Sequence, residues 1–115
     1  MALKIETSMR RMDVMVLALH GNLDMSTLAE LEKIIKEIEG MSGRKVVCDF
    51  SGLEFVSSAG WGAFVGLKGR LSESGGDLCI AGMNEDVARI HEVMGLGAMM
   101  KAVADVEAGI AEFGG

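Results

Sequence analysis

Apolar segments of strand length alternate with amphipathic segments of helix length along the chain, and this alternation constrains the fold more than any other feature. Two strand-like segments, 3–10 and 14–19, come first, and each later one is separated from the next by a helical pattern. Parallel strands need such a crossover, whereas antiparallel strands can be joined by a tight turn. The order ββαβαβαβα therefore predicts an α/β fold, with helices packed on a mixed sheet of four to five strands.

Periodicity, turn residues and capping residues predict where these elements begin and end. A short turn at 11–13 is expected to join the first two strands. Thr27 and Glu30 have the spacing of a capping box, Asn84 can cap a later helix, and Gly40 can end the first. The expected strands are 3–10, 14–19, 44–50, 78–81 and 98–103, and the expected helices are 27–40, 59–72, 84–93 and 105–113.

Composition narrows the class of protein. Hydrophobic residues make up 50% of the 115 positions, so we expect a single domain, 1–115, with one compact core. The net charge of −6 argues against a nucleic-acid-binding surface, which needs a basic face. No apolar run approaches the roughly 18 residues of a membrane span, and the N-terminus lacks the order of a signal peptide. A cytoplasmic protein is expected.

The cysteines and histidines give no sign of a metal site. Cys48 and Cys79 lie inside strand-like apolar runs, where buried, reduced thiols are expected, although a disulfide between neighbouring strands stays open. The sequence contains no Cys-x-x-Cys motif and no Cys/His pair with zinc-ligand spacing. We interpret His20 as a strand-end residue and His91 as a helix-surface residue.

Segment 49–62 joins an apolar strand to a glycine-containing helix and carries Ser57 and Ser58 at the junction. A helix N-terminus has free N–H groups and partial positive charge, so a hydroxyl there is well placed to carry a phosphate. The plain alternative is that Ser58 is a helix N-cap, which contributes about 1 kcal/mol.

Two enzymatic interpretations fit the junction poorly. A nucleophile elbow needs Gly-x-Ser-x-Gly, but Val56 stands at the first glycine position, and only the two histidines are available as a base. A dinucleotide loop needs its glycines before the helix, whereas Gly60, Gly62 and Gly66 fall inside it. We therefore expect no enzyme and no cofactor, and we interpret the glycines as close approach of this helix to the sheet or to a partner.

Segment 46–65 resembles the signature of STAS domains, the anti-sigma factor antagonists of bacteria: an apolar strand, Asp-x-Ser, then Asp-Ser-Ser/Ala/Thr-Gly-Leu-Gly. Segments 21–24, 75–81 and 87–96 resemble other family motifs in the same order, so the resemblance covers the whole chain. It implies the STAS fold. Ser58 matches the phosphorylated residue and Asp24 the loop acid beside it.

Two positions depart from the family pattern. Ser57 replaces the usual aspartate, which removes a charge next to the acceptor and makes Ser57 a second-choice phosphorylation site. Trp61 replaces the usual leucine, and both a core position and an interface anchor are open for it. The partner-binding residues implied by the resemblance are Asp24, Ser57, Ser58, Gly60, Trp61 and Gly62.

The resemblance also implies a function in signal transduction and transcription regulation by partner switching. An unphosphorylated family member binds an anti-sigma factor that is also a serine kinase, phosphorylation by that kinase releases it, and a PP2C-like phosphatase resets it. No direct contact with nucleic acid or membrane is expected. The alternative is a non-switching STAS scaffold or ligand-sensing module in which Ser58 is only a helix cap.

Overall fold

The computed structural model describes residues 3–11, 13–41 and 44–114, so Met12 of the predicted hairpin turn lies outside them. The predicted order of strands and helices is confirmed, with a short 3-10 helix, η1, added before the last strand. The elements are β1 (Lys4–Met9), β2 (Val14–Leu23), α1 (Leu28–Glu39), β3 (Lys45–Val56), α2 (Ser58–Glu73), β4 (Asp77–Ala81), α3 (Glu85–Val93), η1 (Leu96–Ala98), β5 (Lys101–Val103) and α4 (Val106–Glu112).

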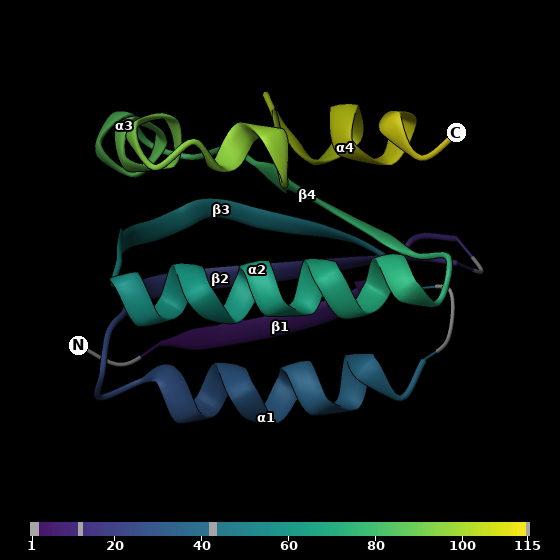
Figure 1. The fold of residues 1–115 in the computed structure, drawn as a ribbon, viewed down its shortest axis with the longest axis horizontal. Coiled ribbons are helices and arrows are strands. Elements are labelled where there is room, and N and C mark those ends of the chain that lie inside the picture. Colours follow the sequence, from purple (N-terminus) through teal and green to yellow (C-terminus); the bar gives the residue numbers. More distant parts are fainter. Residues whose placement is uncertain (1–2, 12, 42–43, 115) are drawn as a thin grey trace.

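The strands form one sheet in the order β1-β2-β3-β4-β5. The hairpin partners β1 and β2 are antiparallel, and every later pair is parallel, as expected where helices make the crossovers. The predicted mixed sheet is therefore confirmed. The two long parallel strands β2 and β3 end on the left of Figure 1, where α1 and α2 begin.

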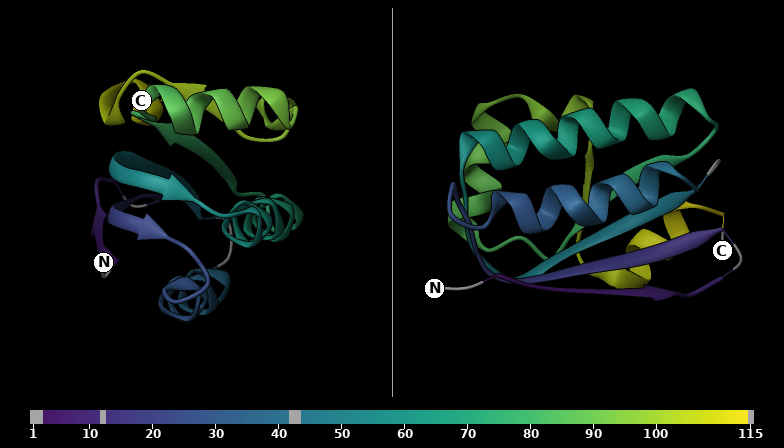
Figure 2. Two further views of the ribbon diagram at one scale, coloured as in Figure 1. Left: turned by 90° about the vertical axis from the view of Figure 1, so that its left-hand side faces the viewer. Right: turned by 90° about the horizontal axis from the view of Figure 1, so that it is seen from below.

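The sheet separates two apolar clusters of unequal size. The larger cluster lies between the sheet and α1, α2 and α3, and α1 contributes to it the stripe Leu31, Ile35 and Ile38, spaced four and three residues apart. The smaller cluster lies on the other face, where Val106 and Ile110 of α4 pack on it. Figure 2 shows α1 and α2 on one side of the strands and α4 on the other.

The neighbouring strands β2 and β3 are longer than the sequence predicts. β2 continues to Leu23 and β3 to Val56, whereas their apolar runs end at 19 and 50. The extensions carry exposed polar residues between buried ones, so only strand pairing, here Gly21 with Leu53 and Leu23 with Val56, reveals them. The longer strands bring the end of β2 beside the end of β3.

The predicted helix ends are confirmed in two cases and wrong in one. Asn84 caps α3 by accepting a hydrogen bond from Val87 N–H at 2.8 Å, and Gly40 is the C-cap of α1. The Thr27 capping box does not form: the Thr27 hydroxyl donates to the Asn22 carbonyl at 2.9 Å and accepts from Asp24 N–H at 3.0 Å. Thr27 therefore fixes the loop before α1 rather than the helix itself.

The two cysteines are buried and free, as expected. Cys48 belongs to the larger apolar cluster and Cys79 to the smaller one, so their side chains lie on opposite faces of the sheet. Burial raises the pKa of the Cys48 thiol well above its ordinary value, and burial together with the Asp77 carboxylate raises that of Cys79 to about 11. Because the two thiols lie on opposite faces of the sheet, they cannot form a disulfide with each other. Within the described residues, no helix is long and apolar enough to cross a membrane.

Candidate functional site

The candidate site lies where the parallel strands end and α2 begins. Ser57 follows β3 directly, and its N–H donates to the carbonyl of Leu23, the last residue of β2, at 2.8 Å. This single hydrogen bond fixes the start of α2 against the loop that carries Asp24. The predicted site residues therefore gather at one end of the molecule (left in Figure 1).

Ser57, and not Ser58, is the N-cap of α2. The Ser57 backbone is extended, with φ −74° and ψ 166°, and its hydroxyl oxygen accepts from Gly60 N–H at 3.1 Å. Serine at this position satisfies one of the N–H groups that a helix leaves without an internal partner. The interpretation of Ser58 as the helix cap is wrong by one residue, because the helix begins at Ser58 itself.

Ser58 is exposed, and its hydroxyl has no hydrogen-bond partner among the described residues. At this end of α2, the Ser57 N–H donates to Leu23 and the Gly60 N–H donates to Ser57. The N–H groups of Ser58 and Ala59 have no hydrogen-bond partner among the described residues. An anion attached to the Ser58 hydroxyl would thus meet free N–H groups and the positive end of the helix dipole. Chemically, the position is suited to carrying a phosphate.

Asp24 lies in the β2–α1 loop, and its carboxylate is occupied by that loop. Oδ1 accepts from the Ser26 hydroxyl at 2.7 Å and from Ser26 N–H at 2.9 Å. The hydroxyl bond is the main cause that lowers the pKa of Asp24, so this side chain stays negative at neutral pH. The structure brings Asp24 to the same end as the serines, without a direct contact to either within the described residues.

The two helix glycines differ in what surrounds them. A Cβ at Gly60 would lie 2.7 Å from Leu23 Cδ2, so this glycine allows the close approach of α2 to the end of β2 that the sequence predicts. A Cβ at Gly62 would meet nothing within 4 Å. Gly62 is therefore not needed for packing inside the chain, and its exposed backbone is available to a partner.

Trp61 is a core residue. Its side chain is 1% exposed, and its ring centroid lies 5.9 Å from that of Phe50 and 5.8 Å from that of His91. Of the two alternatives for Trp61, the core position is the one observed. The prediction of a surface His91 is wrong: the ring is buried, with Nε2 2.8 Å from the Met100 carbonyl oxygen.

An apolar pocket of about 80 Å³ beside this end was not predicted from the sequence. Phe55 and Ile90 line it, and both are large hydrophobic residues left exposed. The available signal was the apolar pattern of segment 84–93, where Val87, Ile90 and Val93 recur every three residues along one side of the helix.

No catalytic arrangement forms among the described residues. His91 contacts Met100 and Trp61, and His20, an exposed residue of β2, lies 3.3 Å from Glu6, so neither histidine is paired with Ser58. In the same part of the chain, no group of three His, Cys, Asp or Glu residues is placed to hold a metal.

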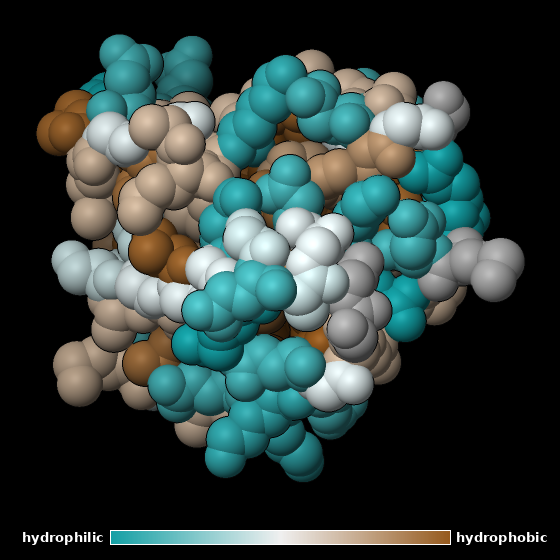
Figure 3. Space-filling model, turned by 45° about the vertical axis from the view of Figure 1, so that its right-hand side comes forward, coloured by the Kyte–Doolittle hydropathy of each residue, from teal (hydrophilic) through white to brown (hydrophobic). Residues whose placement is uncertain are grey.

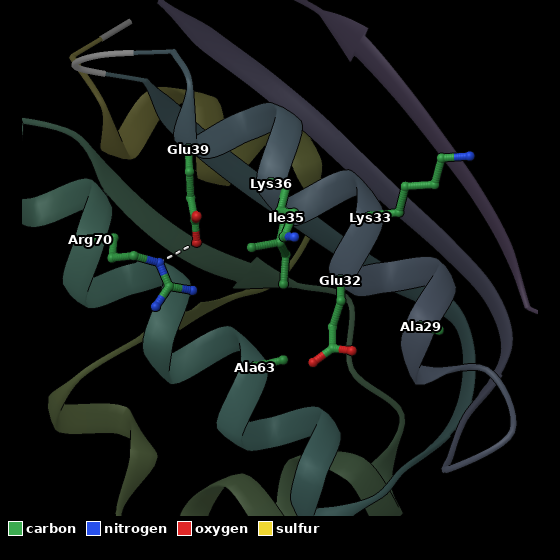
Figure 4. Close-up of a pocket in the computed structure, with 8 residues that line it drawn as sticks. All are labelled: Ala29, Glu32, Lys33, Ile35, Lys36, Glu39, Ala63 and Arg70. Atoms are coloured by element: carbon green, nitrogen blue, oxygen red, sulfur yellow. Dashed lines mark hydrogen bonds and ion pairs between the residues drawn. The ribbon is translucent and has the colours of Figure 1, made fainter.

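A groove with a volume of about 700 Å³ lies elsewhere, between α1 and α2 (Figure 4). The Glu39 carboxylate pairs across it with the Arg70 guanidinium. Its lining is mostly charged, and hydrophilic side chains also gather over α1 in the lower part of Figure 3. This groove contains no predicted site residue and is a solvated seam between two helices.

Three comparisons relate the chain to known proteins. The family model of the STAS domain matches residues 7–109. The anti-sigma-B factor antagonist of Staphylococcus aureus (strain NCTC 8325 / PS 47) is 29% identical over 80 residues, 70% of this chain and 74% of that protein.

Solved structures share the fold. An anti-sigma factor antagonist from Mycobacterium paratuberculosis matches with a TM-score of 0.86 and 20% identity over 96% of this chain and 92% of that one. The Bacillus cell fate determinant SpoIIAA in its phosphorylated form matches with a TM-score of 0.74 and 20% identity over 96% of this chain and 99% of that one.

Proposed function

The chain belongs to the STAS domain family, and we propose that it is an anti-sigma factor antagonist switched off by phosphorylation of Ser58. In this proposal, the unphosphorylated chain binds a kinase-type anti-sigma factor and thereby frees a sigma factor. The kinase then phosphorylates Ser58, the complex dissociates, and a PP2C-like phosphatase restores binding. The chain acts by binding rather than by catalysis, and the proposal implies a cytoplasmic location. The S. aureus relative is named an anti-sigma-B factor antagonist, which supports the proposed antagonism of an anti-sigma factor.

The observation that carries the proposal is that only one of the two serine hydroxyls is used by the fold. Ser57 uses its hydroxyl to cap α2, whereas the Ser58 hydroxyl is exposed and unbonded. Modification of Ser58 therefore breaks no hydrogen bond that holds the fold. A phosphoryl group adds about −1.5 to −2 charges at neutral pH, and a helix N-terminus stabilises that charge.

The same phosphate opposes binding to a partner. It would stand at the end of the molecule where Ser58 and Gly62 present an uncovered helix start. A docked protein would have to exclude water from a doubly charged group, which is costly unless the partner supplies matching cations. The proposal thus predicts a large change in affinity with little change in fold.

The test uses the kinase-type anti-sigma factors encoded in the same genome, each expressed and purified. Wild-type chain, Ser57→Ala and Ser58→Ala are incubated with each kinase and ATP, and phosphate is mapped by mass spectrometry. We expect phosphate on the wild type and on Ser57→Ala, and none on Ser58→Ala. Binding is measured in parallel, and Ser58→Asp should bind at least about tenfold more weakly than wild type, a difference of roughly 1.4 kcal/mol. Equal binding by Ser58→Asp would refute the switch.

A non-switching STAS scaffold or ligand-sensing module is the second candidate. The observation in its favour is Ser57, which keeps the cap but lacks the negative charge of the family's aspartate. This candidate predicts stable binding to a partner and no phosphate on Ser58 with any of the kinases.

A further inference from the structure

Exposed apolar side chains lie at the end of β3, where Phe55 is 51% exposed, and on α3, where Ile90 and Val93 are exposed. We infer that the anti-sigma factor, beyond contacting Ser58, inserts an apolar side chain into the pocket between Phe55 and Ile90. This inference rests on the proposed function, because it assigns a second contact to the same partner. It adds a site for affinity that is separate from the phosphorylated residue.

Helix α3 buries a polar residue and leaves apolar ones exposed, the reverse of what residue type favours. It buries His91 against Trp61 and leaves Ile90 44% exposed, with Val93 exposed one turn further on. Isoleucine is normally among the most buried residues and histidine is intermediate. The helix thus has an apolar face that no described part of the chain covers.

The end of β3 adds to this face. Phe55, 51% exposed, lines the same pocket as Ile90, and the buried Trp61 ring forms part of its wall. A pocket of about 80 Å³ has room for the end of one apolar side chain, not for a separate cofactor. Aromatic and aliphatic residues grouped around a small pocket are typical of the anchor points of protein interfaces.

The pocket is continuous with the proposed switch. Val56 lines the pocket, and the next two residues are the cap Ser57 and the exposed Ser58. A partner that covers Ser58 therefore reaches the pocket without crossing another element, on the end of the molecule that faces the viewer in the left panel of Figure 2.

Charge around the pocket indicates the partner's chemistry. Two acidic residues, Glu54 and Asp86, line it, and Arg89 is within 3.3 Å of Asp86. Glu54 has no ion-pair partner among the described residues. The complementary surface is an apolar side chain flanked by a basic one, as opposite charges at an interface rim favour association.

The experiment measures dissociation constants of the chain with the purified kinase-type anti-sigma factors of the same genome. Phe55→Thr and Ile90→Gln are compared with Met9→Thr, a matched control that removes a hydrophobic residue 47% exposed on β1, outside the pocket. We expect the two pocket variants to bind about 10- to 100-fold more weakly and the control to change less than about twofold. Glu54→Gln should weaken binding more at low than at high salt.

Hydrogen exchange on the wild-type complex gives a second measurement that needs no variant. Backbone amides of 54–56 and of α3 should be protected by the partner, and those of β1 should not. Unchanged affinity of both pocket variants, together with absent protection of α3, would overturn the inference while Ser58→Asp still reports on the switch. If the wild-type chain binds none of the kinases, the proposed function fails and the second contact falls with it.

Discussion

Adding one methyl group to α2 should have opposite effects at two positions a half-turn apart. At Gly60, the new Cβ of alanine would lie 2.7 Å from Leu23 Cδ2, 2.9 Å from Leu23 Cγ and 3.1 Å from Val56 Cγ1. Leu23 is fully buried and cannot move aside without disturbing the core. At Gly62, the same methyl group would meet nothing within 4 Å.

The magnitudes follow from two competing effects. Alanine is favoured over glycine inside a helix by about 0.5–1 kcal/mol, because glycine loses more conformational freedom on folding. Overpacking a filled site costs about 1–3 kcal/mol. Gly62→Ala gains only the first effect and should be about 0.5–1 kcal/mol more stable. Gly60→Ala has both effects, which together leave a loss of about 0–2.5 kcal/mol. Because the new Cβ would make three close contacts with buried side chains, we expect a loss of about 1–2 kcal/mol.

Thermal unfolding followed by circular dichroism separates the two variants. For a domain of this size, 1 kcal/mol corresponds to roughly 4 °C in Tm. Gly62→Ala should therefore melt about 2–4 °C above wild type and Gly60→Ala about 4–8 °C below it. A stabilised Gly60→Ala would mean that Leu23 does not press on α2, and a destabilised Gly62→Ala would mean that the helix surface there is not open.

Three further predictions test other parts of the structure. Ser57→Ala should lose about 1 kcal/mol in urea denaturation because it removes the cap, whereas Ser58→Ala should change stability by less than about 0.5 kcal/mol. Trp61→Ala should lose about 3–5 kcal/mol in the same assay because the ring is buried, and a loss below about 1 kcal/mol would contradict a core position. Burial raises the pKa of Cys79 from an ordinary 9.0 to about 11, so the folded state favours the protonated thiol. The resulting contribution to stability is fully present below pH 9.0 and is lost as the pH rises towards 11. Ellman's reagent at pH 8 should accordingly leave both thiols unlabelled until denaturant is added, and rapid labelling of the native chain would contradict their burial.

The order of elements was predictable because helix and strand periods differ strongly in this chain. The stripe Leu31, Ile35 and Ile38 of α1 has helical spacing and is buried. The lengths of β2 and β3 were not predictable, because their last residues are mixed in polarity and become strand only by pairing with each other. Tertiary contacts, not local pattern, set those boundaries.

The start of α2 was predictable to within one residue, which is the limit of sequence reasoning at helix ends. Ser57 and Ser58 are both suitable caps by type, and only the backbone conformation decides that the helix begins at Ser58. The α3 surface was missed for a related reason. In this nine-residue helix Val87, Ile90 and Val93 share one side, but only Val87 is buried, because the contacts of His91 with Trp61 and the Met100 carbonyl set the buried face.

The replacement of the family's aspartate by Ser57 separates two roles that one side chain can combine. Aspartate and serine both rank among the best N-cap residues, so the oxygen that accepts from Gly60 N–H is retained. The negative charge that aspartate would place beside Ser58 is absent. The fold therefore tolerates serine at this position, and we expect the missing charge to affect the binding of a partner instead. In the proposed switch, less charge beside Ser58 leaves more of the partner's affinity to the neighbouring surface, and the exposed pocket of Phe55 and Ile90 is the apolar surface next to it.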